Sequence, residues 1–204
     1  TVDGSNDLQA GSLLGPSFDT TSVMATLDKI GAVYTHIDDE ALLLEQTAEA
    51  LADHKVVGWF QGRMEFGPRA LGSRSILGDA RSAEMQRTMN LKIKLRESFR
   101  PFAPSILRER VSDYFEMAPE HESPYMMLVA PLKASRRLPE PATDSGPLTG
   151  FAKLSVARSD VPAITHVDGS ARVQSVDAQR HGRYYRLLKR FEATTGSPIL
   201  INTS

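Results

Sequence analysis

The sequence predicts an α/β fold, and three observations support this class. Segments with apolar residues at helical spacing alternate with short runs of strand-forming residues. The run over residues 56–60 is nearly all apolar, which is typical of a strand in a sheet covered on both faces. A Gly-rich basic turn follows this strand at once, and α/β sheets gather their ligand sites at strand ends. The length of 204 residues fits one large domain, or one domain with an appendage.

The N-terminal part is expected to hold a lead-in and a first helix. Residues 1–20 are polar and rich in Gly and Ser, which favours an extended linker before the domain itself, residues 21–204. In the domain, Val23, Leu27 and Ile30 fall on one face of a first helix. A Thr is available as its N-cap, and a Gly follows as its stop.

A strand and a second helix are expected next. Residues 32–37 contain Val, Tyr and Ile, which favour extended backbone. Asp38 and Asp39 can cap a second helix that continues to about His54. The helically spaced apolar residues of this helix are Ala41, Leu44, Ala48 and Leu51.

Further strands are expected along the rest of the chain. Residues 163–167 and 172–176 predict a hairpin, with Asp168-Gly169 as its turn. The other strand candidates are residues 74–78, 103–107, 126–132 and 198–204.

Two more helices and one long loop complete the pattern. Ser82 can cap a helix that continues toward Ile93, and Gly196 can stop a helix over about residues 181–195. Residues 133–150, with several prolines and small polar residues, predict a mobile loop. The inward-facing residues of the two helices are Met85 and Met89 in the first, and Tyr184, Leu187, Leu188 and Phe191 in the second.

Composition excludes several classes of protein. With 41% hydrophobic and 24% charged residues the chain is typical of a globular protein. No apolar run approaches the roughly 20 residues that cross a bilayer, and no signal pattern opens the sequence, so we expect no membrane contact and a cytoplasmic location. The absence of cysteine excludes disulfides, thiolate metal sites and a cysteine nucleophile. A net charge of -1 argues against a general nucleic-acid binder.

Positive charge is concentrated between residues 61 and 110. This stretch holds eleven Lys and Arg against five Asp and Glu, a local balance of +6 in a chain whose total is -1. Gly and Pro surround Arg69 and Arg100, so these cations lie at turns and element ends. A guanidinium fork beside such turns suits phosphate oxygens. The alternative is a solvated basic surface, which charge alone would favour, but the glycine and proline pattern favours a phosphate site.

Familiar catalytic motifs are absent from the sequence. It has no Walker-type loop, no dinucleotide-binding glycine motif, no His-Glu-x-x-His and no Gly-x-Ser-x-Gly. The five histidines show no ligand spacing, so no metal ligands are predicted, and only His166 stands out because it precedes the Asp168-Gly169 turn. Glu65 and Glu97 are better placed to orient arginines than to act as a general base.

Four motifs together resemble one family. They are residues 65–77, 94–104, 166–174 and 201–204, and the first two are long enough to be specific. The sequence resembles the carbamoyltransferases that make O-carbamoylated nodulation factors and antibiotics, of the nodulation, cephamycin, novobiocin and tobramycin types. The resemblance extends over nearly the whole chain from about residue 13. Members of this family are much longer, and the chain resembles their C-terminal domain alone.

The resemblance implies a fold and a reaction. The fold would be YrdC-like, a twisted mixed sheet with flanking helices, and residues 1–20 would be the linker from an N-terminal actin/sugar-kinase-like domain. In the reaction, carbamoyl phosphate and ATP give a carbamoyl-adenylate and pyrophosphate. Mg²⁺ would accompany the ATP as a cofactor. The N-terminal domain would transfer the carbamoyl group to a hydroxyl acceptor. The family continues past Asn-Thr-Ser with Phe-Asn-x-Arg, so we expect residues 21–204 to lack the last part of the nucleotide site.

The resemblance also implies the site residues. Lys94 and Arg100 match a Lys-x-x-x-x-x-Arg-Pro pattern of the family and would be catalytic. The residues that bind the nucleotide and phosphate would be Arg69, Lys94, Arg100, Arg172, Asn202 and Ser204. This agrees with physical chemistry, because joining two polyanions requires several cations that offset their repulsion and stabilise the transition state.

Two other hypotheses remain open at this stage. The chain could be a non-catalytic YrdC-like module that binds a nucleotide or a structured RNA through the same basic residues, although the near-neutral total charge makes nucleic acid a weaker partner. It could also be a non-catalytic half of a longer protein that only docks, through an apolar surface, onto the N-terminal domain.

Overall fold

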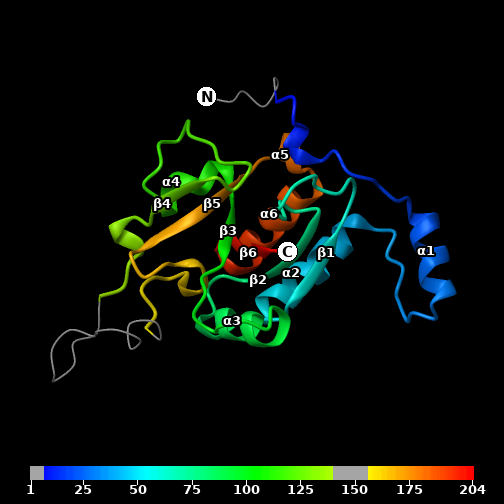
Figure 1. Ribbon diagram of the computed structural model, residues 1–204, viewed down its shortest axis with the longest axis horizontal. Coiled ribbons are helices and arrows are strands. Elements are labelled where there is room, and N and C mark those ends of the chain that lie inside the picture. The colour runs from blue at the N-terminus through cyan, green and yellow to red at the C-terminus, as the bar shows by residue number, and fades with distance from the viewer. Residues whose placement is uncertain (1–6, 140–155) are drawn as a thin grey trace.

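Six strands form one mixed sheet in the order β1-β2-β6-β3-β5-β4 (Figure 1). The computed structural model describes residues 7–139 and 156–204. Only β3 and β5 are parallel neighbours, and every other adjacent pair is antiparallel. The strands are β1 (Val57–Phe60), β2 (Arg74–Asp79), β3 (Ala103–Leu107), β4 (Leu128–Pro131), β5 (Ser170–Val176) and β6 (Ile199–Thr203). The predicted α/β class, a mixed sheet with flanking helices, is confirmed.

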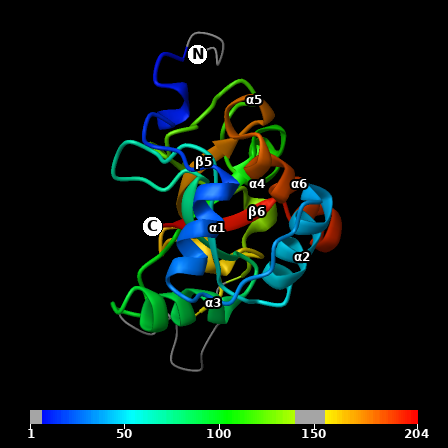
Figure 2. The same cartoon turned by 90° about the vertical axis from the view of Figure 1, so that its right-hand side faces the viewer.

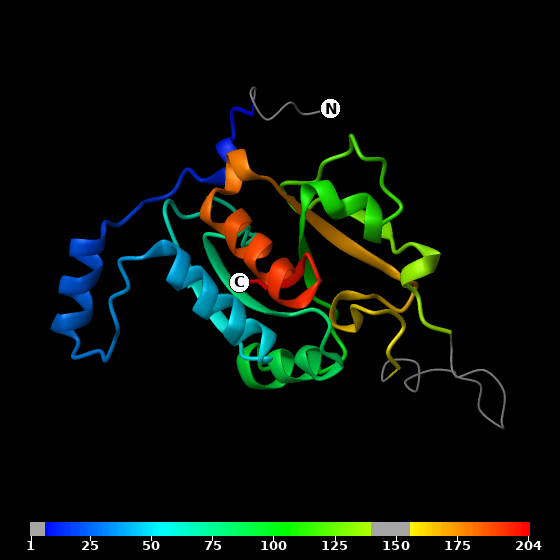
Figure 3. The same ribbon diagram turned by 180° about the vertical axis from the view of Figure 1, so that it is seen from behind.

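Two long helices lie side by side on one face of the sheet (Figure 3). They are α2 (Glu40–Ala52) and α6 (Arg183–Thr195). As predicted, Asp39 caps α2, and Gly196 ends α6 in the left-handed conformation with φ 75°. The shorter helices are α1 (Thr20–Lys29), α3 (Ala83–Thr88), which continues as a π turn over Met89–Ile93, α4 (Val111–Tyr114) and α5 (Ala178–His181). Single 3-10 turns cover Ala10–Ser12, Arg108–Arg110, Ala134–Arg136 and Pro162–Ile164.

The sheet separates two hydrophobic cores, and β6 contributes to both. Leu200 packs with the inward residues of α2 and α6, all of which are buried except Ala41. Ile199 and Ile201 point to the other face, where Met85 and Met89 lie. This alternation follows from the two-residue period of a strand.

The prediction that residues 56–60 form a strand covered on both faces is wrong. β1 lies at the edge of the sheet and pairs with β2 only. Trp59 is buried, but Phe60 is 54% exposed. An edge strand with two apolar faces looks like a central strand in sequence, because periodicity does not report which neighbours a strand has.

The expected strand over residues 32–37 is also absent, since these residues lie in irregular structure between α1 and α2. Val33 is fully exposed, and Tyr34 bonds back to Asp28 of α1 through its hydroxyl. Helix α1 itself lies outside the sheet beyond β1 (Figures 1 and 2). None of its residues is buried, and Asp19, not a threonine, provides the N-cap.

The predicted hairpin over residues 163–176 is replaced by a 3-10 turn and one strand. Pro162 starts the turn Pro162–Ile164, and only the second half of the hairpin, β5, is extended. The Asp168-Gly169 turn is present, with the amide of His166 donating to the carbonyl oxygen of Ser170 at 2.8 Å. Most of the predicted mobile loop over 133–150 lies outside the described residues. In the described ranges no helix is both long and apolar enough to cross a membrane.

Candidate functional site at the end of β6

Strand directions bring several loops to one edge of the sheet. β6 is antiparallel to β2 and β3, with Asn202 opposite Ala103 of β3. β5 is parallel to β3. The end of β6 therefore lies beside the starts of β2, β3 and β5. The segments that enter these three strands, residues 65–73, 94–102 and 166–169, meet at this edge.

This topology explains why four motifs far apart in the sequence belong together. Three of them enter or begin a strand at this edge, and the fourth is the end of β6. The structure places all six predicted site residues in these segments or at the adjoining strand ends: Arg69, Lys94, Arg100, Arg172, Asn202 and Ser204.

Asn202 ties β6 to the turn that carries Arg69. Its Nδ2 donates to the carbonyl oxygen of Ala70 at 3.0 Å and to Oε1 of Gln174 at 2.8 Å. Gln174 in turn donates from Nε2 to the carbonyl oxygen of Leu71 at 2.8 Å. The Oδ1 atom of Asn202 is buried and accepts no hydrogen bond from the described residues. A buried acceptor without a donor is costly, so Oδ1 suits a donor group of a ligand.

Arg69 and Arg172 form a pair of like charges. Burial, and then the charge of Arg69, lower the pKa of the Arg172 guanidinium. The Nε of Arg172 is buried and finds no hydrogen-bond acceptor in the described part of the chain. Its Nη2 lies 3.8 Å from the sulfur of Met126. Two cations that repel each other, one with an unused donor, suit an anionic ligand.

The segment that enters β3 carries the other predicted cations. Lys94 Nζ donates to the carbonyl oxygen of Ser204, which joins this segment to the end of β6. The Arg100 side chain is 55% exposed and forms an ion pair with Glu97 at 3.2 Å. Lys94 therefore lies at the end of β6, whereas Arg100 points toward solvent.

Arg96 is a cation that the sequence analysis missed. Its guanidinium lies over the ring of Phe102, 4.8 Å from the ring centre. Burial, and then the charge of Arg100, lower its pKa. Gln174 was missed as well. Both residues lie inside the motifs 94–104 and 166–174, so the signal was present, but only the fold shows what each side chain contacts.

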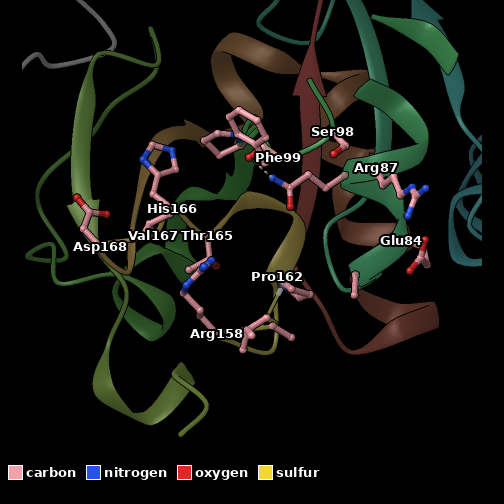
Figure 4. A pocket seen from close by; sticks show the side chains of 15 residues that line it. Glu84, Arg87, Ser98, Phe99, Arg158, Pro162, Thr165, His166, Val167 and Asp168 are labelled. Carbon is pink, nitrogen blue, oxygen red and sulfur yellow. Dashed lines mark hydrogen bonds between the residues drawn. The ribbon is translucent and has the colours of Figure 1, made fainter. Parts of the chain in front are cut away.

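A cavity of about 860 Å³ adjoins this edge (Figure 4). Figure 4 shows His166 and Asp168 on one side of it and Arg87 and Glu84 of α3 on the other, with Phe99 between them. None of the six predicted residues lines the cavity. The sequence singled out only His166 among its wall residues, because the walls come from α3, residues 98–101 and residues 156–168, and only tertiary packing brings these together.

His166 connects the cavity to the basic residues. Its pKa is lowered, first by burial and further by the charge of Arg172, against an opposing effect of Asp168. Its Nδ1 lies 3.5 Å from the hydroxyl of Ser170, at the limit of a hydrogen bond. A neutral histidine in this place can donate to or accept from a ligand in the cavity. No group of three or more His, Asp or Glu that could hold a metal occurs in the described ranges.

Comparison with known proteins identifies the family. Residues 48–204 match the family model described as carbamoyltransferase C-terminus. The chain is 53% identical over 200 residues to an uncharacterized protein of Synechocystis, covering 97% of this chain and 32% of that protein.

Relatives with named roles are similar over most of the chain. A nodulation protein, NolNO, of Sinorhizobium fredii is 41% identical over 172 residues, which are 83% of this chain and 22% of the relative. The 3'-hydroxymethylcephem-O-carbamoyltransferase of Streptomyces clavuligerus is 37% identical over 167 residues, 81% of this chain and 27% of that enzyme. The chain spans about a third or less of the length of these relatives. It belongs to the carbamoyltransferase family, as the C-terminal domain of that family.

Proposed function

We propose that this domain binds ATP and carbamoyl phosphate at the end of β6 and forms a carbamoyl-adenylate. Transfer of the carbamoyl group to a hydroxyl acceptor would then belong to the remainder of a longer protein, since the relatives are three or more times as long. One relative is named as an O-carbamoyltransferase, which supports a carbamoyl group passing to oxygen.

The observation that carries the proposal is the pair Arg69 and Arg172. Arg172 is partly buried beside a second guanidinium, which lowers its pKa, and its Nε has no acceptor in the described ranges. Keeping two such groups close costs free energy in the absence of an anion, and a polyphosphate would offset this repulsion. Lys94 and Arg100 would supply further positive charge from the segment that enters β3.

The chemistry needs positioning and charge more than a nucleophile. Carbamoyl phosphate and water give carbamate and phosphate. A carbamate oxygen then bonds to the α-phosphorus of ATP while the bond to the β-phosphate oxygen breaks, and pyrophosphate leaves. Lys94 and Arg100 would stabilise the negative charge that spreads over the phosphate oxygens in this step.

The remaining site residues would orient the nucleotide. Asn202 would accept a hydrogen bond from it at the free Oδ1, and Ser204 would bind next to Lys94. The adjoining cavity, with the ring of Phe99 43% exposed, has room for the nucleoside. Mg²⁺ would be held chiefly by the phosphates of ATP, because it keeps most of its own waters.

Calorimetric titration with MgATP, followed by carbamoyl phosphate, tests the proposal. We expect saturable ATP binding that Lys94→Ala weakens at least about tenfold, while Lys29→Ala, which removes an exposed lysine of α1, leaves it unchanged. Pyrophosphate release should depend on carbamoyl phosphate. Absence of ATP binding would contradict the proposal. Stronger binding of a structured RNA than of ATP, with a steep salt dependence, would favour the RNA-binding alternative.

A further inference from the structure

The turn over residues 70–74 is an anion-binding turn that the chain fills with its own carboxylate. Three main-chain amides converge on Oε1 of Glu65: those of Leu71 at 2.7 Å, Ser73 at 2.8 Å and Arg74 at 3.2 Å. Successive amides aimed at one point bind anions. The side chain of Glu65 is fully buried, so no substrate phosphate can reach these amides while it is in place.

The arginine side chains are not the main partners of this carboxylate. The sequence suggests that Glu65 orients arginines, but its nearest guanidinium contact is Arg74 Nε at 3.8 Å from Oε2. Oε2 is buried and accepts no hydrogen bond from the described residues. The main-chain amides therefore hold Glu65, and Glu65 holds the turn.

The turn that Glu65 holds carries two parts of the proposed site. Arg69 precedes it directly, and its charge lowers the pKa of the Arg172 guanidinium. The carbonyl oxygen of Ala70 accepts the hydrogen bond that fixes the amide of Asn202. A shift of the turn would therefore move a guanidinium and reorient the free Oδ1 of Asn202 together.

Glu65 is itself held in place by the lead-in on both sides. The amide of Met64 donates to the carbonyl oxygen of Pro16 at 2.9 Å, and the amide of Gly15 donates to the carbonyl oxygen of Met64 at 2.9 Å. On the other side, the amide of Phe66 donates to the carbonyl oxygen of Ser12 at 2.7 Å. These bonds leave the backbone around Glu65 little freedom.

We propose that Glu65 is a positioning residue: its buried carboxylate substitutes for a ligand in the 70–74 turn and thereby sets the places of Arg69 and Asn202. This inference rests on the proposed function of the site. It also assigns the substrate phosphates to side chains and not to the amides of this turn.

Two substitutions separate positioning from other roles. Glu65→Gln keeps an oxygen that accepts from the same three amides but removes the charge, so we expect ATP binding within about threefold of the wild type. Glu65→Ala removes the acceptor, and we expect binding to weaken about 10- to 100-fold, as misplaced binding groups do. Glu49→Ala, which removes an exposed carboxylate of α2, is the matched control and should leave ATP affinity unchanged.

A spectroscopic readout makes the test independent of ATP. In ¹H-¹⁵N spectra the amides of Leu71 and Ser73 should be protected from hydrogen exchange in the wild type and in Glu65→Gln, and exposed in Glu65→Ala. Thermal melts show whether each variant is folded.

The outcomes are distinct. If the wild type fails to bind ATP, the proposed function is wrong, and the exchange experiment still decides what Glu65 does. If Glu65→Gln loses ATP binding as completely as Lys94→Ala while these amides stay protected, Glu65 acts through its charge and the inference is overturned. If Glu65→Ala binds ATP as the wild type does, the turn does not position the site, and the inference is again overturned.

Discussion

The two loops that bring cations to the end of β6 are held in opposite ways. Buried side chains from several strands fix the 65–74 turn, and Trp59 Nε1 and Gln61 Nε2 each donate to the carbonyl oxygen of Gly72 at 3.0 Å. In the 94–101 segment, Leu95 and Arg100 are exposed, and Leu95 has a positive φ of 48°. We expect the turn to be preorganised and the segment to adjust when a ligand binds. The proposed site would then combine a rigid cation with adaptable ones.

The largest expected loss of stability comes from a substitution in the rigid turn. Gly72 has φ +109°, and a Cβ there would lie 2.1 Å from a ring carbon of Tyr184. We expect Gly72→Ala to reduce the free energy of unfolding by about 3 kcal/mol, because strain and overpacking add. Gly62, with φ +55° and no atom within 4 Å of its Cβ position, is the control, and Gly62→Ala should cost about 1 kcal/mol. Urea unfolding measures both, and equal costs would mean that the turn is not tightly packed.

The next effect concerns Asn90, a buried anchor of the adaptable segment. Asn90 donates from Nδ2 to the carbonyl oxygens of Ser98 at 3.0 Å and Arg100 at 2.8 Å, and its Oδ1 accepts from Arg96 Nε at 2.6 Å. We expect Asn90→Ala to lower stability by about 2 kcal/mol, since it leaves buried polar groups unpaired. ATP binding should weaken about tenfold.

The control for this anchor is Gln86→Ala. Gln86 is half-buried and donates to the carbonyl oxygens of Phe99 and Arg100 through hydrogen bonds that are exposed to solvent. Its loss should cost about 0.5 kcal/mol. A smaller loss of stability for Asn90→Ala than for Gln86→Ala would show that the segment does not depend on its buried anchor.

Mild acid should loosen the rigid turn selectively. His181 lines a small cavity of about 220 Å³ behind Leu71, Gly72 and Ser73, and burial lowers its pKa from the ordinary value of 6.5. Because the unfolded chain binds a proton that the folded chain excludes, stability present above pH 6.5 is lost as the pH falls below it. The loss is at most about 1.4 kcal/mol per pH unit.

The free energy of unfolding, measured at pH 7.5 and at pH 5.5, shows whether stability falls in mild acid as expected. His181→Asn should flatten the dependence, while His36→Asn, at a side chain that is 42% exposed, should not. After correction for the slower intrinsic exchange at pH 5.5, the protection of the amides of Leu71 and Ser73 should fall, while that of residues 94–101 should stay the same. Greater stability at pH 5.5 in the wild type would contradict the assignment.

The smallest expected change in stability comes from removing the ion pair between Glu97 and Arg100, and it tests whether this pair holds Arg100 in place. Glu97 forms its ion pair while 56% exposed, so Glu97→Gln should change stability by less than about 0.5 kcal/mol. We expect ATP affinity to rise by up to about threefold, because one negative charge near the phosphates is removed. Titrations at low and high salt measure this. A loss of affinity would mean that Glu97 orients Arg100 and that the segment is as preorganised as the turn.

Local signals predicted the elements whose causes are local. Asp39 caps α2 and Gly196 ends α6 as expected, because a cap depends on a few adjacent residues. The strand expected at residues 32–37 failed because strand propensity at Val33 has no effect without a neighbouring strand to pair with. The hairpin failed because Pro162 favours the start of a 3-10 turn.

For the candidate site, the sequence motifs propose residues but do not show how these are arranged. The motifs identify Arg69 and Arg172, yet their proximity follows from the order of the strands, which no spacing reports. Glu65 was recognised as unusual in a basic stretch. Its partners are main-chain amides, however, and a sequence does not show which amides a turn leaves free.

Strand β6 lies between two antiparallel neighbours and contributes side chains to both cores. Its amides should therefore exchange with solvent only when the whole molecule unfolds. Among the described residues, we therefore expect the proposed site residue Asn202 to lie in the slowest-exchanging part and Arg100 in one of the fastest. Exchange measured with and without ligand would show the gain in protection almost entirely at residues 94–101, so that the signal of binding appears where the protein was least ordered beforehand.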